Sequence, residues 1–299
     1  MTEGAREWAK RLGTTGVWTH DVERMPVAGA RDYVHAIESL GFAALWIPES
    51  LGSKEAFAHA GLLLAATKTL VVATGIANIW ARDPVAMANG ARTLVDAYPD
   101  RFLLGLGVSH APTVKIRGQN YARPLEYMRR YLEAMDAAPY VGPKVDVPRV
   151  LAALGPQMLR LSAERALGAH SYFVPIEHTG AARKELRAAP LLVVEQAAVV
   201  SEDPVEARAT ARRHMKRYLE LDNYVNNLRR LGWSEADLSG GGSDKLVDAI
   251  VAWGGTGAIR SRIDEHRKRG ADHVCLQVLR ADLKGSPTAD LERVAKAVL

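Results

Sequence analysis

Short apolar runs alternate with longer segments of helical periodicity along almost the whole chain. Eight of these runs are predicted as strands, and each is separated from the next by a segment in which apolar residues recur at helical spacing. The predicted strands are 16–18, 43–47, a third that begins at Leu70, 102–106, 150–153, 169–174, 191–200 and 274–279. This regular alternation favours a closed (β/α)8 barrel, a TIM barrel, over an open doubly wound sheet.

The length and composition agree with that architecture. A barrel of about 250 residues would use most of the 299 residues, so we expect residues 1–299 to form a single domain. The sequence contains one cysteine, Cys275, which excludes an intrachain disulfide and a cysteine zinc cluster, and no metal site is expected.

Charge and hydropathy narrow the range of partners. The 39 basic and 34 acidic residues are scattered, and no basic block is interleaved with aromatic residues, so we expect no nucleic-acid partner. No apolar run approaches the roughly 18 residues of a membrane span, and the polar first residues lack the apolar core of a secretion signal. A cytoplasmic, soluble protein is therefore expected, and its net charge of +5 suits an anionic ligand.

Polar and aromatic residues follow several of the predicted strands, at the ends where TIM barrels bind ligands. The third strand leaves through Asn78, Trp80 and Arg82 into Asp83-Pro84, a helix-start signal, and we interpret this exit as the floor of a ligand site. Trp46 lies on the second strand, and the other exits carry Glu49, Ser50, Ser109, His110, Glu177, His178 and Gln277.

Each candidate also has a structural interpretation. Glu49 is equally consistent with a loop carboxylate near a helix start, and His110 with an exposed loop histidine. Glu177 and His178 could merely favour a helix N-terminus. Tryptophans on or beside strands usually pack in the core.

Three glycine-containing segments have different interpretations. Residues 105–110, GLGVSH, lack the third glycine of a dinucleotide fingerprint and belong to the fourth strand–helix unit, so we interpret Gly105 and Gly107 as letting the backbone approach a ligand. The turn 154–157, LGPQ, precedes a helix start, where free amides favour a phosphate. Residues 239–243, SGGGS, predict a flexible loop or lid edge.

The sequence lacks the residues that other TIM-barrel chemistries require. No His-x-His is found on the first strand, no lysine follows a strand where a Schiff base would form, and Cys275 is in mid-strand. Planar apolar walls, backbone donors and few titratable groups remain. Such a site suits a bound redox cofactor that carries the chemistry itself.

Four segments resemble the luciferase-like monooxygenase superfamily and, within it, the coenzyme F-420-dependent oxidoreductases. They are residues 41–49 (GFAALWIPE), 73–78 with 82–84 (ATGIAN, RDP), 101–107 (RFLLGLG) and 155–164 (GPQMLRLSAE). The segments 246–248, 271–274 and 277–279 look like the last two units of that family.

The resemblance implies a (β/α)8 barrel, usually dimeric, that binds a flavin or deazaflavin against a bulge at the end of the third strand, often with a non-proline cis peptide. The resemblance places this bulge at Gly75-Ile76 and the cofactor ring near Asn78. It also places Val108, Ser109 and His110 beside the ring, and the phosphate tail near Gly155, Pro156 and Gln157.

One departure from the family pattern affects the expected chemistry. Many deazaflavin enzymes of the family have Asp-His after the second strand, where this chain has Glu49-Ser50, so the proton-transfer role is expected at His110 or Glu49. Residues expected to shape the substrate side are Trp46, Trp80, Glu177 and His178. The resemblance implies hydride transfer between coenzyme F-420 and a small organic substrate. The alternatives are an FMN-dependent monooxygenase and a non-catalytic flavin-binding barrel.

Overall fold

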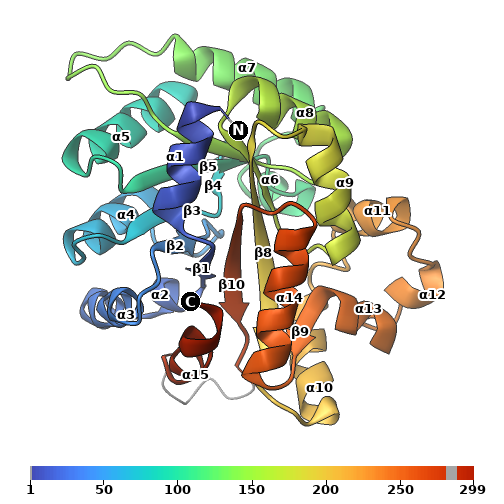
Figure 1. The fold of residues 1–299 in the computed structure, drawn as a ribbon. Helices are drawn as coiled ribbons and strands as arrows, with labels where there is room; N and C mark the ends of the chain where they lie inside the picture. Colours follow the sequence, from blue (N-terminus) through green and yellow to red (C-terminus); the bar gives the residue numbers. More distant parts are fainter. Residues whose placement is uncertain (1, 281–287) are drawn as a thin grey trace.

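Eight parallel strands close into a barrel that is surrounded by helices, as predicted (Figure 1). The computed structural model describes residues 2–280 and 288–299. The barrel strands are β1 (Thr15–Trp18), β2 (Ala44–Ile47), β3 (Val71–Thr74), β5 (Phe102–Gly107), β6 (Arg149–Ala152), β7 (Gly168–Ser171), β8 (Leu191–Val199) and β10 (His273–Val278). The barrel is closed because β10 pairs with both β8 and β1.

Helices follow the strands in the order that the sequence predicts. The helices are α1 (Glu3–Leu12), α2 (Asp21–Arg24), α3 (Val27–Ser39), α4 (Ala56–Ala65), α5 (Pro84–Ala97), α6 (Ala111–Ile116), α7 (Pro124–Asp136), α8 (Pro156–Arg165), α9 (Ile176–Leu186), α10 (Pro204–Met215), α11 (Asp222–Arg230), α12 (Glu235–Leu238), α13 (Asp244–Ile250), α14 (Thr256–Lys268) and α15 (Ala289–Val298). Among the described residues, no helix is long and apolar enough to cross a membrane.

Two helix boundaries are set by specific contacts. Glu55 caps α4, while the hydroxyl of nearby Ser53 donates to the carbonyl of Ser50, 3.0 Å away. Helix α13 ends at Ile250, where the backbone becomes the short strand β9 (Val251–Trp253) on the edge of β8.

The third strand of the barrel is interrupted. Its second part, β4 (Ala77–Asn78), also pairs with β5, but in a different register. Ala73 faces Leu103 and Ala77 faces Leu106, so this strand spans four residue steps where β5 spans three. The bond between Gly75 and Ile76 is cis, which confirms the prediction drawn from the resemblance.

The glycines of β5 make room for this interruption. A Cβ at Gly105 would lie 2.0 Å from the carbonyl oxygen of Thr74. The Thr74 hydroxyl also bonds to the backbone of Gly105. It donates to the Gly105 carbonyl (2.8 Å) and accepts from the Gly105 amide (2.9 Å). A Cβ at Gly107 would overlap the side chain of Ile76. The close approach is therefore to the neighbouring strand, which corrects our interpretation of these glycines as contacts to a ligand.

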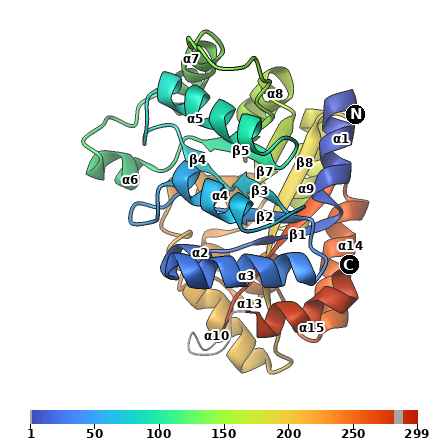
Figure 2. The ribbon, with the colours of Figure 1, turned by 90° about the vertical axis from the view of Figure 1, so that its left-hand side faces the viewer.

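Helix α1 packs across the amino ends of the barrel strands and lies beside β8 (Figure 2). Its buried residues Ala5, Trp8 and Leu12 form one apolar cluster with inward-facing strand residues such as Val71 and Leu191. The first of these contacts begins only three residues after the helix cap at Thr2. Apolar side chains of α1 thus fill the amino end of the barrel.

Candidate functional site

A cavity of about 510 Å³ lies at the carboxyl ends of the barrel strands, and we refer to it as the mouth cavity. Residues after β1, β2, β3 and β5 line one side, and the segment 217–224 lines the other. Six of the predicted site residues meet here: Glu49, Gly75, Ile76, Asn78, Ser109 and His110. Strand polarity alone brings them together, because parallel strands deliver their exits to one end of a barrel.

The floor of the mouth cavity is the interrupted third strand. The indole of Trp18 is buried beneath it, and its Nε1 donates to the Gly75 carbonyl at 3.2 Å. A Cβ at residue 75 would lie 2.6 Å from that Nε1, so only glycine fits above the indole. The side chain of Asn78 is turned back onto its own strand, where Oδ1 accepts from the amide of Trp80 at 2.9 Å. The floor is thus fixed before any ligand binds.

Glu49 braces this floor. One oxygen of its carboxylate forms an ion pair with Arg82, and the other accepts from the Asn78 amide (2.7 Å) and from Arg82 Nη1 (3.1 Å). Only 6% of its side chain is exposed, and Arg82 also pairs with Glu55. These contacts favour a positioning role for Glu49 over the proton-transfer role that we expected from the sequence.

His110 lies at the rim of the mouth cavity, at the start of α6. Its Nδ1 is 3.0 Å from the Asn223 side-chain oxygen, and its ring packs against Tyr224 with centroids 5.5 Å apart. Burial lowers the pKa of His110, and the nearby Arg217 guanidinium contributes to this shift. The imidazole is therefore neutral at neutral pH and is held against α11.

A hydrogen-bonded group of tyrosines forms the opposite wall, and no local sequence pattern predicts it. The Tyr172 hydroxyl is 2.7 Å from that of Tyr218 and donates to Oε1 of Gln277 at 2.9 Å. Arg217 donates to the Tyr218 hydroxyl at 2.8 Å. Burial raises the pKa of Tyr172 well above 10, so this hydroxyl stays protonated and can donate. Tyr172 and Tyr218 are 46 residues apart in the chain, which hides the pair from pattern reading.

A buried carboxyl group, Glu195 on β8, lies in the interior of the barrel. Its Oε2 accepts from the amide of Phe173 at 3.1 Å, and its Oε1 has no hydrogen-bond partner among the described residues. Burial raises the pKa of Glu195 to about 8. It is therefore mostly protonated at neutral pH, as expected for a carboxyl group without a counter-ion.

The structure places four predicted substrate-side residues outside the mouth-cavity lining. Trp46 is fully buried and stacks on His170, with ring centroids 4.8 Å apart. Trp80 stacks on Tyr127 at 4.0 Å, and its Nε1 donates to the carbonyl of Val108 at 2.9 Å. Both tryptophans therefore follow the core-packing alternative.

The other two, Glu177 and His178, lie in the first turn of α9. His178 is buried, its Nε2 is 2.9 Å from the Leu154 carbonyl oxygen, and burial lowers its pKa to about 4. This neutral ring supports the turn that leads into α8.

That turn, 155–157, offers donors to an anion. Gly155 is the N-cap of α8 and, having no side chain, makes no capping hydrogen bond to the first amides of the helix. A Cβ at Gly155 would lie 3.7 Å from Nη2 of Arg230, so a guanidinium approaches the same helix end. Helix N-termini and arginines both favour phosphate oxygens. The sequence predicted the turn but not Arg230, which arrives from α11.

The glycine stretch 239–243 does not line the mouth cavity. Arg212 donates to the Gly242 carbonyl at 3.2 Å, and Ser243 caps α13, so the stretch forms an anchored turn. The segment that lines the mouth cavity opposite the strand exits is 217–224, which was not predicted from the sequence.

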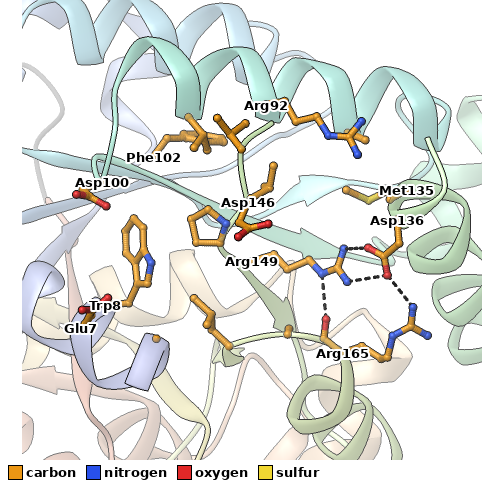
Figure 3. A pocket seen from close by; sticks show the side chains of 18 of the residues that line it. Glu7, Trp8, Arg92, Asp100, Phe102, Met135, Asp136, Asp146, Arg149 and Arg165 are labelled. Atoms are coloured by element: carbon orange, nitrogen blue, oxygen red, sulfur yellow. Dashed lines mark hydrogen bonds and ion pairs between the residues drawn. The ribbon is translucent and has the colours of Figure 1, made fainter. Parts of the chain in front are cut away.

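A second, larger hollow of about 800 Å³ lies among α1, α5, α7 and α8, beside the amino ends of β5 and β6 (Figure 3). Two of its arginines, Arg149 and Arg165, already pair with Asp136, at 2.6 and 2.9 Å (Figure 3). Ligands of TIM barrels bind at the opposite end. We therefore assign the candidate active site to the mouth cavity.

Comparisons with known proteins bear on the family and the fold. Residues 10–273 match the luciferase-like monooxygenase family. A 5,10-methylenetetrahydromethanopterin reductase of Methanolobus tindarius is 25% identical over 157 residues, 46% of this chain and 48% of that protein. A putative coenzyme F-420-dependent oxidoreductase of Mycobacterium tuberculosis is 31% identical over 109 residues, 36% of this chain and 31% of that protein.

The chain thus matches less than half the length of these curated relatives. Among solved structures, an F-420-dependent secondary alcohol dehydrogenase in complex with an F-420–acetone adduct superimposes with a TM-score of 0.70. The alignment covers 96% of this chain and 98% of that one at 16% identity, which supports the fold. From the match over residues 10–273, the protein belongs to the luciferase-like monooxygenase family.

Proposed function

We propose that the protein transfers a hydride between coenzyme F-420 and a small organic substrate bound in the mouth cavity. The observation that carries this proposal is the pairing of two features. One is the rigid floor at Gly75-Ile76, and the other is the anion-binding turn at Gly155 with Arg230. A planar ring on the floor and a phosphate-bearing tail on the turn together fit this cofactor class.

The residues of the chain would bind, orient and shield the cofactor. Gly75, Ile76 and Asn78 would support the ring, with Glu49 and Arg82 holding their backbone in place. The first amides of α8 and the guanidinium of Arg230 would hold the phosphate. When bound, coenzyme F-420 supplies or accepts the hydride, so the protein has to provide only position, shielding and a proton.

An FMN-dependent monooxygenase is the second candidate, because the matching family is named for monooxygenases and FMN also joins a planar ring to a phosphate. We favour coenzyme F-420 because the similar proteins include a putative F-420-dependent oxidoreductase and an F-420-dependent dehydrogenase. A barrel that binds a flavin without catalysis is the third.

Titration of the purified protein with coenzyme F-420 and with FMN, followed by cofactor fluorescence, separates these candidates. We expect saturable micromolar binding of coenzyme F-420 and weaker binding of FMN. Consumption of the reduced coenzyme with a panel of simple ketones, aldehydes and enones then tests for turnover. Binding of FMN alone would support the monooxygenase, binding without turnover of any panel compound would support the non-catalytic barrel, and binding of neither cofactor would contradict all three candidates.

Replacing Arg230 with alanine should weaken coenzyme F-420 binding by about 10- to 100-fold, because a charge-assisted hydrogen bond to phosphate contributes about 1.5–3 kcal/mol. The matched control is Arg160→Ala on the exposed face of α8, where the guanidinium pairs with Glu185. This control should leave the Kd unchanged. Equal affinities of the Arg230 variant and the wild type for coenzyme F-420 would contradict the proposal that the cofactor phosphate binds at this turn.

A further inference from the structure

A histidine that the sequence analysis did not select, His20, lies where β1 opens into the mouth cavity. Its Nδ1 is 2.8 Å from Oε2 of Glu23, with side-chain exposures of 16% and 9%. A carboxylate only accepts hydrogen bonds, so Nδ1 carries a proton and donates it. In the neutral ring the lone pair is then on the other nitrogen, Nε2.

That second nitrogen, Nε2, is buried and has no hydrogen-bond partner among the described residues. The His20 side chain belongs to the wall of the mouth cavity together with Ser50, Gly75 and Ile76. Its ring meets the Trp18 indole edge-on, with centroids 4.8 Å apart, and the same indole donates to the Gly75 carbonyl. One aromatic ring therefore separates the imidazole from the cavity floor.

Contacts from the loop after β2 hold Glu23 and its turn in place. The Ser50 hydroxyl approaches Oε2 of Glu23 at 3.5 Å. Lys54 donates to the backbone carbonyls of Val22, Glu23 and Met25, at 2.9, 2.8 and 2.7 Å. The loop after β2 thus holds the turn that carries the Glu23 carboxylate. The geometry of the His20–Glu23 pair is therefore fixed before a ligand binds.

The contacts of the other two candidates, Glu49 and His110, make them less suited to proton transfer than His20. The Glu49 carboxylate is occupied by Arg82 and the Asn78 amide. His110 is oriented by the Asn223 amide oxygen rather than by a carboxylate. A carboxylate partner stabilises the imidazolium that forms when a histidine accepts a proton, whereas an amide does so less.

We propose that His20 is a catalytic residue that transfers the proton coupled to hydride transfer, and that Glu23 is its positioning residue. This inference rests on the proposed function. In the reducing direction, the carbonyl carbon of the substrate would take up the hydride that bound coenzyme F-420 supplies, and the π electron pair of the carbonyl would move onto its oxygen. The His20 imidazolium gives its Nε2 proton to that oxygen. The alcohol leaves, the ring is neutral, and a solvent proton restores it; oxidation reverses each step.

The first test needs no substrate. Nitrogen-15 NMR of the imidazoles in the whole protein should show the Nδ1–H tautomer for neutral His20. In Glu23→Gln this preference should be lost, because an amide can donate as well as accept, while the signals of exposed His35 stay unchanged and report an intact fold. An Nε2–H tautomer in the wild type would overturn the proposal.

The second test uses the panel compound that the wild type turns over fastest. His20→Asn keeps an amide nitrogen near the position of Nδ1 but has no equivalent of Nε2. It should lower kcat about 100-fold, within the usual range for general acid–base catalysis, while the Kd for coenzyme F-420 changes less than twofold. Glu23→Gln should lower kcat about tenfold, and the matched surface control His35→Asn should not change it.

The outcomes separate this inference from the proposed function. A wild-type protein that does not bind coenzyme F-420 contradicts the proposed function itself. A His20→Asn variant that binds the coenzyme and turns over at the wild-type rate contradicts only the catalytic role of the pair. If His20→Asn fails to fold, the Glu23→Gln tautomer and its tenfold kcat loss decide the matter.

Discussion

Replacing Gly105 with alanine should destabilise the barrel by about 4 kcal/mol or more and leave little folded protein. The new Cβ would lie 2.0 Å from the Thr74 carbonyl oxygen, and both atoms belong to paired backbone that cannot move independently. Clashes of this kind exceed the usual 1–3 kcal/mol of overpacking, because no side chain can rotate to relieve them. Urea unfolding followed by circular dichroism measures the loss.

The matched control is Gly257→Ala. Gly257 lies near the start of α14, and its Cβ position has no described atom within 4 Å apart from its own stretch of helix. Alanine there should be neutral or stabilise the protein by up to about 1 kcal/mol, as expected for glycine replacement in a helix. If Gly105→Ala unfolded at the same urea concentration as this control, the close approach of β5 to the interrupted strand would be contradicted.

The second large effect is a change in the pH dependence of stability in Glu195→Gln. Burial raises the pKa of Glu195 from 4.5 to about 8, so the folded state keeps a proton that the unfolded chain releases. The free energy of unfolding of the wild type therefore falls as pH rises from about 4.5 to about 8. Glutamine does not titrate, so its variant should gain up to about 4 kcal/mol relative to wild type over that window, at 1.36 kcal/mol per unit.

Urea titrations at pH 5 and pH 8 measure this difference, and comparing the two values removes any constant packing effect of the amide. Glu7→Gln, at an exposed position of α1, is the control and should give equal stabilities for variant and wild type at both pH values. A Glu195→Gln variant whose advantage did not grow between the two pH values would show that the carboxyl group is ionised in the folded state.

Strand positions could be predicted because each barrel strand is a short apolar run that ends in a distinct break. The cis bond at Gly75-Ile76 was predicted only through the resemblance, since no local pattern distinguishes it from an ordinary strand end. The direction in which each strand side chain points could not be predicted. β2 is buried on both sides, so alternation gave no sign that Trp46 packs in the interior and not in the cavity.

Side chains that reach the site from distant parts of the chain were not predictable. Arg230 is the last residue of α11 and Tyr218 lies in the turn after α10. The residues that they meet at the site, Gly155 and Tyr172, are tens of residues away in the chain. Glu195 is a single carboxylate in a nine-residue apolar strand. His20 could have been predicted from the sequence, because a histidine at a strand exit with a glutamate three residues later is a recognisable pattern. The expected homodimer and cytoplasmic location stay predictions.

The helix that fills the amino end of the barrel has a kinetic consequence. With Trp8 and Leu12 of α1 packed against the inner strand residues, the mouth is the route by which both cofactor and substrate reach the floor. A ring that rests on Gly75-Ile76 has to bind before the molecule that covers it. We therefore expect compulsory-order kinetics in which the cofactor binds first and leaves last.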